Sequence, residues 1–215
     1  MKLETFNEIT RAARLAVNNT AKDQEVAKKM GQFGFPARRM QEGKDLLTVT
    51  LEMQQTQKDR YDENWQISSR IEQELLTLRP LFMDHVTAVR FAFRRDPAVL
   101  RTFNVKSIAM NKWTWVEQAR SFYETIQAYR KQMAVFGITR EELDQAQASV
   151  AAVIELRDDR MYKKGEAEDS TESRNQASKL LKKWVREFHT AARLALKDNP
   201  QKLEAFGIKV PSLSK

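Results

Sequence analysis

Apolar residues recur at intervals of three and four along much of the chain, which is the pattern of amphipathic helices. The clearest stripe comprises Ile67, Ile71, Leu75, Leu78, Phe82, Val86, Val89 and Phe93. Two further stripes comprise Ala177, Leu181, Trp184, Phe188, Ala191 and Ala195, and Val116, Ala119, Tyr123, Ile126 and Met133. This spacing predicts helices that bury one face in a core, with a cofactor pocket as the alternative interpretation.

Short motifs predict where these helices begin and end. Four triplets have an aromatic residue, then Gly or Asn, then an apolar residue, at 33–35, 103–105, 136–138 and 206–208. Gly and Asn tolerate the left-handed conformation that ends a helix, so the triplets predict helix ends; a Gly-rich ligand loop is the alternative. The pairs 96–97 and 199–200, Asp-Pro and Asn-Pro, predict helix starts, and capping boxes are predicted from Thr114 and Thr139.

These signals predict helices at 4–30, 37–62, 66–95 and 97–102, and again at 112–134, 140–163, 168–197 and 200–206. The charged segment 163–170 is interpreted as the exposed tip between two antiparallel helices. The aligned segment 60–67 contains Tyr61 and Trp65, which are predicted either to form a contact surface or to pack on a neighbouring helix. Pro80 predicts a kink or the start of a helix.

The chain also matches itself at a shift of 103 residues. Residues 87–106 and 190–209 are identical at 8 of 20 positions without a gap, and the same shift aligns the Phe-Gly triplets. The sequence therefore predicts an all-α, elongated helical bundle made of two tandem copies of a helix–turn–long-helix-hairpin unit. The predicted repeats are residues 1–107 and 108–215, either as separate bundles or merged into one.

The amino-acid composition favours helix and excludes sites that require cysteine. The 215 residues include only six Gly and five Pro, and no Cys. Thiolate zinc sites, disulfides and cysteine nucleophiles are thereby excluded. The first residues contain no apolar signal region, and no run of 18 apolar residues occurs, so a cytoplasmic location without a membrane partner is expected.

No motif predicts a catalytic, metal or cofactor site. The two histidines, His85 and His189, are preceded three positions earlier by Phe82 and Arg186, so the Glu-x-x-His pattern of carboxylate-bridged metal bundles is missing. Both histidines are expected to be exposed or half-buried. Nucleophile-elbow, phosphate-loop and dinucleotide motifs are missing too, so we expect a protein that is not an enzyme and needs no cofactor.

The formal net charge of +8 is interpreted first as a solvated basic surface, with attraction of an anionic partner as the alternative. The candidate surface for such a partner comprises Arg38, Arg39, Arg94, Arg95, Lys182, Lys183 and Arg186. Long helices without catalytic motifs favour a bundle that binds a macromolecule, with a protein as the expected partner. Nucleic-acid binding through the dispersed basic residues is the alternative, and self-association is left open.

Overall fold

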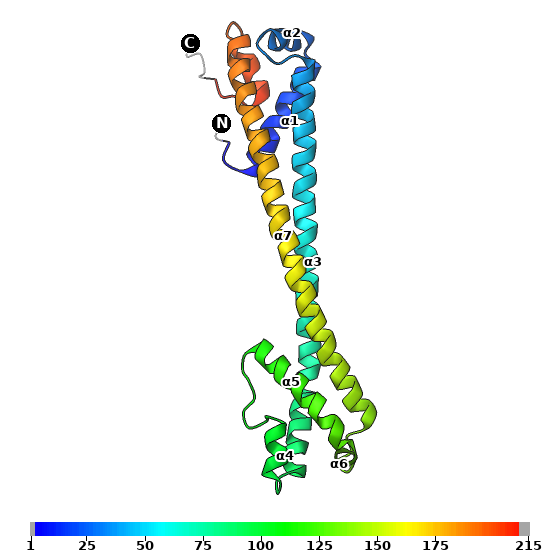
Figure 1. The fold of residues 1–215 in the computed structure, drawn as a ribbon. Coiled ribbons are helices and arrows are strands. Elements are labelled where there is room, and N and C mark those ends of the chain that lie inside the picture. The colour runs from blue at the N-terminus through cyan, green and yellow to red at the C-terminus, as the bar shows by residue number, and fades with distance from the viewer. Residues whose placement is uncertain (1–2, 211–215) are drawn as a thin grey trace. The chain divides into compact units, whose positions relative to one another are not determined.

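The computed structural model describes residues 3–210, and within that range the chain is helical and contains no strand. The elements are α1 (Phe6–Lys22), α2 (Gln24–Gln32), α3 (Ala37–Ala92), α4 (Pro97–Thr102), α5 (Lys112–Ile126), η1 (Gln127–Tyr129), α6 (Arg130–Ala134), α7 (Arg140–Ala195) and η2 (Pro200–Phe206) (Figure 1). The predicted all-α class is therefore confirmed.

The helices form two compact units, and each long helix contributes to both. The first unit comprises the chain up to Tyr61 and the chain from Glu166 onward, so it contains α1, α2, the first part of α3, the last part of α7, and η2. The second unit comprises residues 62–165 and contains the rest of α3, α4 to α6, and the first part of α7. The units do not coincide with the predicted repeats 1–107 and 108–215, because each unit takes segments from both.

The predicted hairpins are wrong, since α3 and α7 each run as one helix of 56 residues through the positions where a chain reversal was expected. A reversal needs residues that break the helix, and Gly165 is the only Gly or Pro in the segment 163–170, where Lys, Glu and Ala favour helix. The charged side chains there contact the opposite helix instead: Lys163 is 3.4 Å from Glu63, and Glu166 is 3.5 Å from Arg60.

The two aromatic residues of the aligned segment lie on the surface. Trp65 is 70% exposed, so it does not pack into a neighbouring helix as one interpretation suggested. Tyr61 is 49% exposed, and its hydroxyl lies 3.4 Å from the Thr171 hydroxyl.

Corresponding elements are separated by the shift found in the sequence. Both bounds of α7 lie 103 residues after the bounds of α3, and η2 begins 103 residues after α4. An internal duplication, as the origin of this regularity, stays a prediction.

The four aromatic-Gly/Asn-apolar triplets do end helices. Asn104, Gly34, Gly137 and Gly207 all have positive φ, at 49°, 86°, 78° and 69°. The apolar residue that follows is buried in every case: Phe35, Val105, Ile138 and Ile208. The left-handed residue turns the chain so that the next side chain covers the end of the core, as the αL motif requires.

The predicted helix starts are confirmed in part. Asp96 caps α4 through its bond with the Val99 amide, whereas Asn199 makes no capping bond and is followed by a 3₁₀ helix. The Thr139 hydroxyl accepts from the Glu142 amide, but the Glu142 carboxylate bonds His85 instead of closing the box. The Thr114 box is wrong, because Asn111 is the N-cap and Thr114 lies inside α5.

Pro80 lies within α3 and does not begin a helix. Proline removes the amide that would donate to the carbonyl of Leu76. Pro80 and Leu76 are both exposed, so water can reach this side of the helix and bond that carbonyl.

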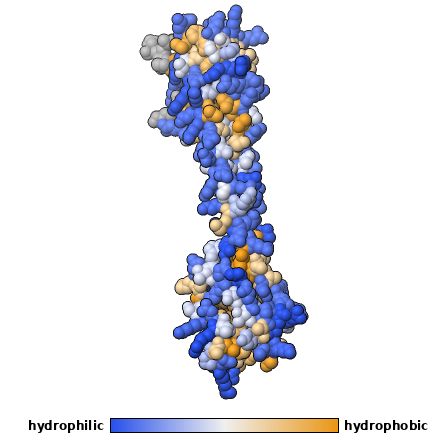
Figure 2. All heavy atoms as spheres, in the orientation of Figure 1, coloured by the Kyte–Doolittle hydropathy of each residue, from blue (hydrophilic) through white to orange (hydrophobic). Residues whose placement is uncertain are grey.

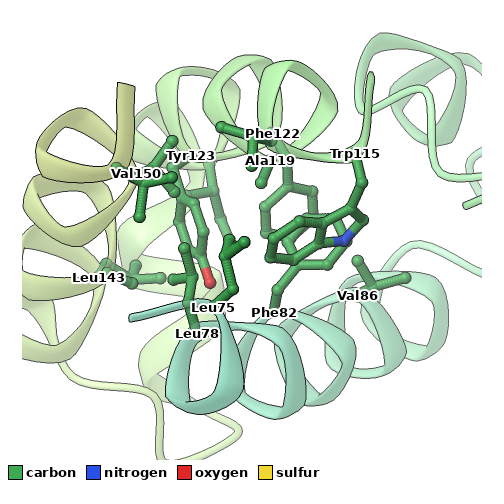
Figure 3. Packing of buried hydrophobic residues seen from close by; sticks show 14 of the residues in the cluster. Leu75, Leu78, Phe82, Val86, Trp115, Ala119, Phe122, Tyr123, Leu143 and Val150 are labelled. Atoms are coloured by element: carbon green, nitrogen blue, oxygen red, sulfur yellow. The ribbon is translucent and has the colours of Figure 1, made fainter. Parts of the chain in front are cut away.

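The core of the second unit is aromatic (Figure 3). Phe82 of α3 points at α5, where its ring meets those of Trp115 and Phe122 edge-on at centroid distances of 5.5 and 5.1 Å. Leu143 and Val150 of α7 close the same cluster from the other side. Edge-to-face ring pairs of this kind are favourable beyond the area that they bury.

The core of the first unit depends on a close contact between α3 and α7. Trp184 of α7 is 2% exposed, stacks on Phe188 and donates its indole N–H to the Arg39 carbonyl at 3.1 Å. Its ring lies directly over Gly43 of α3, where an added Cβ would overlap with three atoms of the indole. A glycine inside a helix lowers stability by about 1 kcal/mol relative to alanine. At position 43 the absence of a side chain leaves the space that the Trp184 indole occupies.

We predict that Gly43→Ala lowers the free energy of unfolding by about 1–3 kcal/mol, despite the better helix propensity of alanine. The control is Gly165→Ala in α7, where nothing lies within 4 Å of the added Cβ. This control should raise stability by about 0.5–1 kcal/mol. Urea denaturation followed by tryptophan fluorescence measures both.

The positions 103 residues away suggest a rescue, because the pair corresponding to Gly43 and Trp184 is Ala146 and Leu81. In a Trp184→Leu background, Gly43→Ala should become neutral or stabilising. An equal loss in both backgrounds would show that the indole is not what Gly43 accommodates.

Candidate interaction surface

The predicted basic residues of the first unit are offset by neighbouring carboxylates. Arg39 pairs with Glu187 and lies 3.5 Å from Glu42, and its guanidinium covers the Phe35 ring. Arg38 lines an open groove of about 560 Å³ together with Glu42 and Asp45. An anion entering here would meet acidic and basic groups side by side.

The remaining basic residues of this unit, all on α7, differ in exposure and in their neighbours. Lys183 lines a cleft of about 310 Å³ with Arg39 and Glu187, and Arg186 is exposed. Lys182 is half-buried, and its charge acts on Glu8 of α1, whose pKa lies below its ordinary value. Bonds from the backbone amides of Thr5 and Glu4 are the main cause of that shift, and Lys182 adds a smaller one. The first unit therefore brings together some predicted residues without forming a continuous positive surface.

The second unit presents aromatic rings beside its predicted arginines. Phe91, near the end of α3, is 55% exposed, and Phe136, after α6, is 39% exposed. The two rings meet edge-on at a centroid distance of 5.9 Å, and Val135 beside them is 80% exposed. The Arg94 guanidinium lies 4.4 Å from the Phe91 ring centroid and donates to the Phe91 carbonyl at 2.8 Å. We call Phe91, Arg94, Val135 and Phe136 the aromatic surface.

The turn at Gly137 explains why Phe136 faces outward. The Gly137 and Ile138 amides bond back to Ala134 and Met133, and this turns Ile138 into the core. In the turns at Asn104 and Gly207 the preceding aromatic residues, Phe103 and Phe206, are 1% and 2% exposed. Helix termination therefore does not require an exposed ring before the left-handed residue.

The corresponding positions of the first unit are also exposed and apolar. Phe33, which precedes Gly34, is 44% exposed, and Leu194 is 55% exposed. They lie 103 residues from Phe136 and Phe91, and Lys197 lies 103 residues from Arg94. Figure 2 shows the setting: apolar patches interrupt an otherwise hydrophilic surface on both units.

Sequence reasoning missed the aromatic surface because Phe136 was assigned only to helix termination and Phe91 only to a matching block. It also missed Arg90, Arg101 and Lys106, which line one pocket of the second unit but are single cations in the sequence. Arg95, which was predicted, is exposed near the start of α4 and does not line that pocket. A pattern of paired cations cannot find residues that a turn brings together.

The histidines are buried, contrary to expectation. His85 is 1% exposed and lies between the Tyr123 hydroxyl, 3.1 Å from Nδ1, and the Glu142 carboxylate, 3.0 Å from Nε2. A proton on Nε2 lets His85 donate to Glu142, while Nδ1 accepts from the Tyr123 hydroxyl. Both ring nitrogens of His85 and the Tyr123 hydroxyl then have partners. Burial, with a smaller effect of the Glu142 charge, raises the pKa of Tyr123, which keeps its hydroxyl protonated.

The sequence of contacts Tyr123–His85–Glu142 has the order of groups found in proton relays. Both His85 and Tyr123 are buried beside the aromatic core, and the pockets of about 560, 420, 310 and 170 Å³ are lined by other residues. A general base must reach the proton that it takes from a substrate. The contacts with Tyr123 and Glu142 satisfy the polar atoms of the buried His85 ring.

His189 lies in the core of the first unit, 6% exposed, and its buried Nε2 has no hydrogen-bond partner within residues 3–210. Burial lowers the pKa of His189 to about 4, and the charge of Arg193 adds to the shift. The imidazole is therefore neutral near pH 7.

Within the described residues, no cluster of three or more His, Asp or Glu side chains is placed to hold a metal ion. In the same part of the chain, none of the helices combines the length and apolarity needed to cross a membrane. Comparisons of the chain with protein-family models, with curated proteins and with solved structures found no match.

We predict that His189 makes the protein less stable in acid. Between pH 6.5 and pH 4 the unfolded chain binds a proton at this residue and the folded chain does not, so falling pH favours unfolding. His189→Leu removes this difference. As the pH falls through this window, the free energy of unfolding of the variant should rise relative to that of the unchanged protein. Urea denaturation at several pH values measures this difference. Parallel curves for the two proteins would contradict the prediction.

Proposed function

We propose that this chain is a non-enzymatic binding module, acting in the cytoplasm, that captures a protein partner on its aromatic surface. The observation that carries the proposal is the exposed ring pair Phe91–Phe136 with Arg94 stacked on it. Protein interfaces are enriched in aromatic residues and arginine, and such residues supply most of the binding energy.

The rings are held in place before any partner binds. Phe91 lies in the last turn of α3, and Phe136 is fixed by the turn at Gly137, whose neighbour Ile138 is buried. The edge-on contact restricts both rings further. A partner therefore loses little binding free energy to the ordering of side chains.

Charge narrows the class of partner. Arg94 lies on the Phe91 ring, and the whole chain carries a net charge of +8. We therefore expect the partner to present an apolar surface bordered by carboxylates, since complementary charge speeds encounter and selects the orientation. The counterpart residues Phe33, Leu194 and Lys197 give the first unit a similar set of groups, so one chain is proposed to hold two partner molecules.

The basic residues of the first unit argue against nucleic acid as the main ligand. Arg39 pairs with Glu187, and acidic residues line both grooves that the predicted cations enter. Binding of nucleic acid is driven largely by protein cations that neutralise phosphates and so release the counterions of the nucleic acid. Cations already paired with carboxylates contribute little to this release.

The test is a capture experiment with matched variants. The unchanged protein, the double variant Phe91→Ser/Phe136→Ser and the control Leu180→Ser would be immobilised and exposed to lysate. Leu180 is 57% exposed on α7 of the first unit, so the control removes an equally exposed apolar side chain elsewhere. Any protein retained by the unchanged chain and the control would then be purified and its affinity measured by calorimetry.

We predict that the double variant weakens this purified complex by about tenfold or more, because truncating a central aromatic residue costs about 2 kcal/mol or more. The control should bind like the unchanged protein. Equal loss in both variants, or none in either, would contradict the proposal.

Two further measurements test the alternatives. Anisotropy of labelled DNA and RNA that shows tight binding at about 150 mM salt would favour nucleic acid instead. Sedimentation that shows a dimer which Phe91→Ser/Phe136→Ser dissociates would identify a second copy of this chain as the partner.

A further inference from the structure

A pocket of about 420 Å³ lies in the second unit where the chain after α4 folds back beside α3. It is lined by Arg90, Pro97, Leu100, Arg101, Asn104, Val105 and Lys106. Its volume falls within the range of pockets that hold small molecules.

Three of the lining residues are cations, and none is a carboxylate. Within residues 3–210, neither Arg101 nor Lys106 has an ion-pair partner, which contrasts with Arg39 in the first unit. Asp96, the acidic residue nearest in sequence, uses a carboxylate oxygen to cap α4 at the Val99 amide. The pocket therefore holds positive charge that an anionic group would neutralise.

The backbone of the pocket is held by side chains from two helices. Arg90 of α3 donates from Nε to the Val105 carbonyl at 3.1 Å, and its Nη2 contacts the same oxygen. Gln118 of α5 donates to the carbonyls of Asn104 and Ser107 at 2.8 and 2.7 Å. These bonds fix the residues on both sides of Lys106, so a ligand meets a largely preformed site.

Apart from the cations and Asn104, the lining is apolar. Pro97 and Leu100 come from α4, and Val105 follows the left-handed turn at Asn104. A site with a few cations and an apolar wall is suited to a ligand that has an anionic head and an apolar body. A bare inorganic anion would leave this wall without a contact.

We propose that this pocket binds a small amphipathic anion, a carboxylate or phosphate group carried on a short apolar chain. The head pairs with Arg101 and Lys106, and the apolar chain lies against Leu100 and Pro97. This inference uses residues other than the aromatic surface, so each proposal can fail without the other.

The corresponding positions of the first unit carry different charges, which is why the binding site is proposed for the second unit only. Arg90 and Lys106 correspond to Arg193 and Lys209, but Arg101 corresponds to Glu204. One substitution thus changes three positive charges into two positive charges and one negative charge. Arg101→Glu gives the second unit the charges of the first.

The experiment is isothermal titration calorimetry of the full chain with octyl phosphate, octanoate, octyl glucoside and inorganic phosphate, each below the concentration at which it forms micelles. We expect one site for octyl phosphate or octanoate, and the stronger of the two identifies the head group. Octyl glucoside should bind at least about tenfold more weakly, since it has the chain without the charge. Inorganic phosphate should also be weaker, since it lacks the chain.

Arg101→Glu should weaken binding of the better probe by about tenfold or more, because it removes one attraction and adds a repulsion. Lys106→Glu should act in the same direction, and it tests the pocket even if Arg101→Glu disturbs α4. Lys28→Glu is the matched control: it changes the net charge equally at an exposed residue of the first unit and should leave binding unchanged. Circular dichroism checks the fold of each variant.

Three results would overturn the inference. They are no binding of either anionic probe, equal binding of octyl glucoside, and equal loss in Lys28→Glu and the pocket variants. Binding of inorganic phosphate as tight as that of octyl phosphate would reject the apolar part of the proposed ligand.

Discussion

The fold depends on the pairing of α3 with α7. Each helix has 56 residues, and most of its buried apolar residues lie in the two core clusters, to which the short helices also contribute side chains. In the first unit the two long helices make a close contact at Gly43, where the missing side chain admits the Trp184 ring to the backbone of α3. Since each unit takes part of both long helices, neither predicted repeat contains all the segments of a unit.

The sequence was informative about local structure because helix ends are determined by local chemistry. Positive φ at Gly34, Asn104, Gly137 and Gly207 follows from what these residues permit, whatever the rest of the chain does. The chain reversals predicted near residues 62–66 and 163–168 were wrong for a complementary reason. Loss of the apolar stripe marks the end of a core, whereas the end of a helix needs a breaker, and charged helix formers with partners on the facing helix keep the helix intact.

The candidate site was harder to predict, because adjacent residues on a helix point in directions about 100° apart. Lys182 and Lys183 illustrate this, since Lys182 is half-buried whereas Lys183 is exposed and lines a cleft with Arg39. Adjacent cations in the sequence are therefore a poor guide to a positive surface. The pocket of the second unit instead gathers Arg90, Arg101 and Lys106 from α3, α4 and the following turn, and only the path of the chain reveals their proximity.

Positions 103 residues apart in the sequence can be compared to distinguish residues that fill the core from residues exposed on the surface. Core residues differ in size between the corresponding positions. Trp184 over Gly43 corresponds to Leu81 and Ala146, of which Leu81 is half-buried, and buried Ala12 corresponds to buried Trp115. A core accepts such exchanges as long as its volume is filled. Phe33 and Phe136 fill no such space, yet a half-exposed ring precedes the left-handed glycine in both units. Because the turn also forms with its aromatic residue buried, as at Phe103 and Phe206, helix termination does not account for the exposed rings, and the proposed partner would cover them.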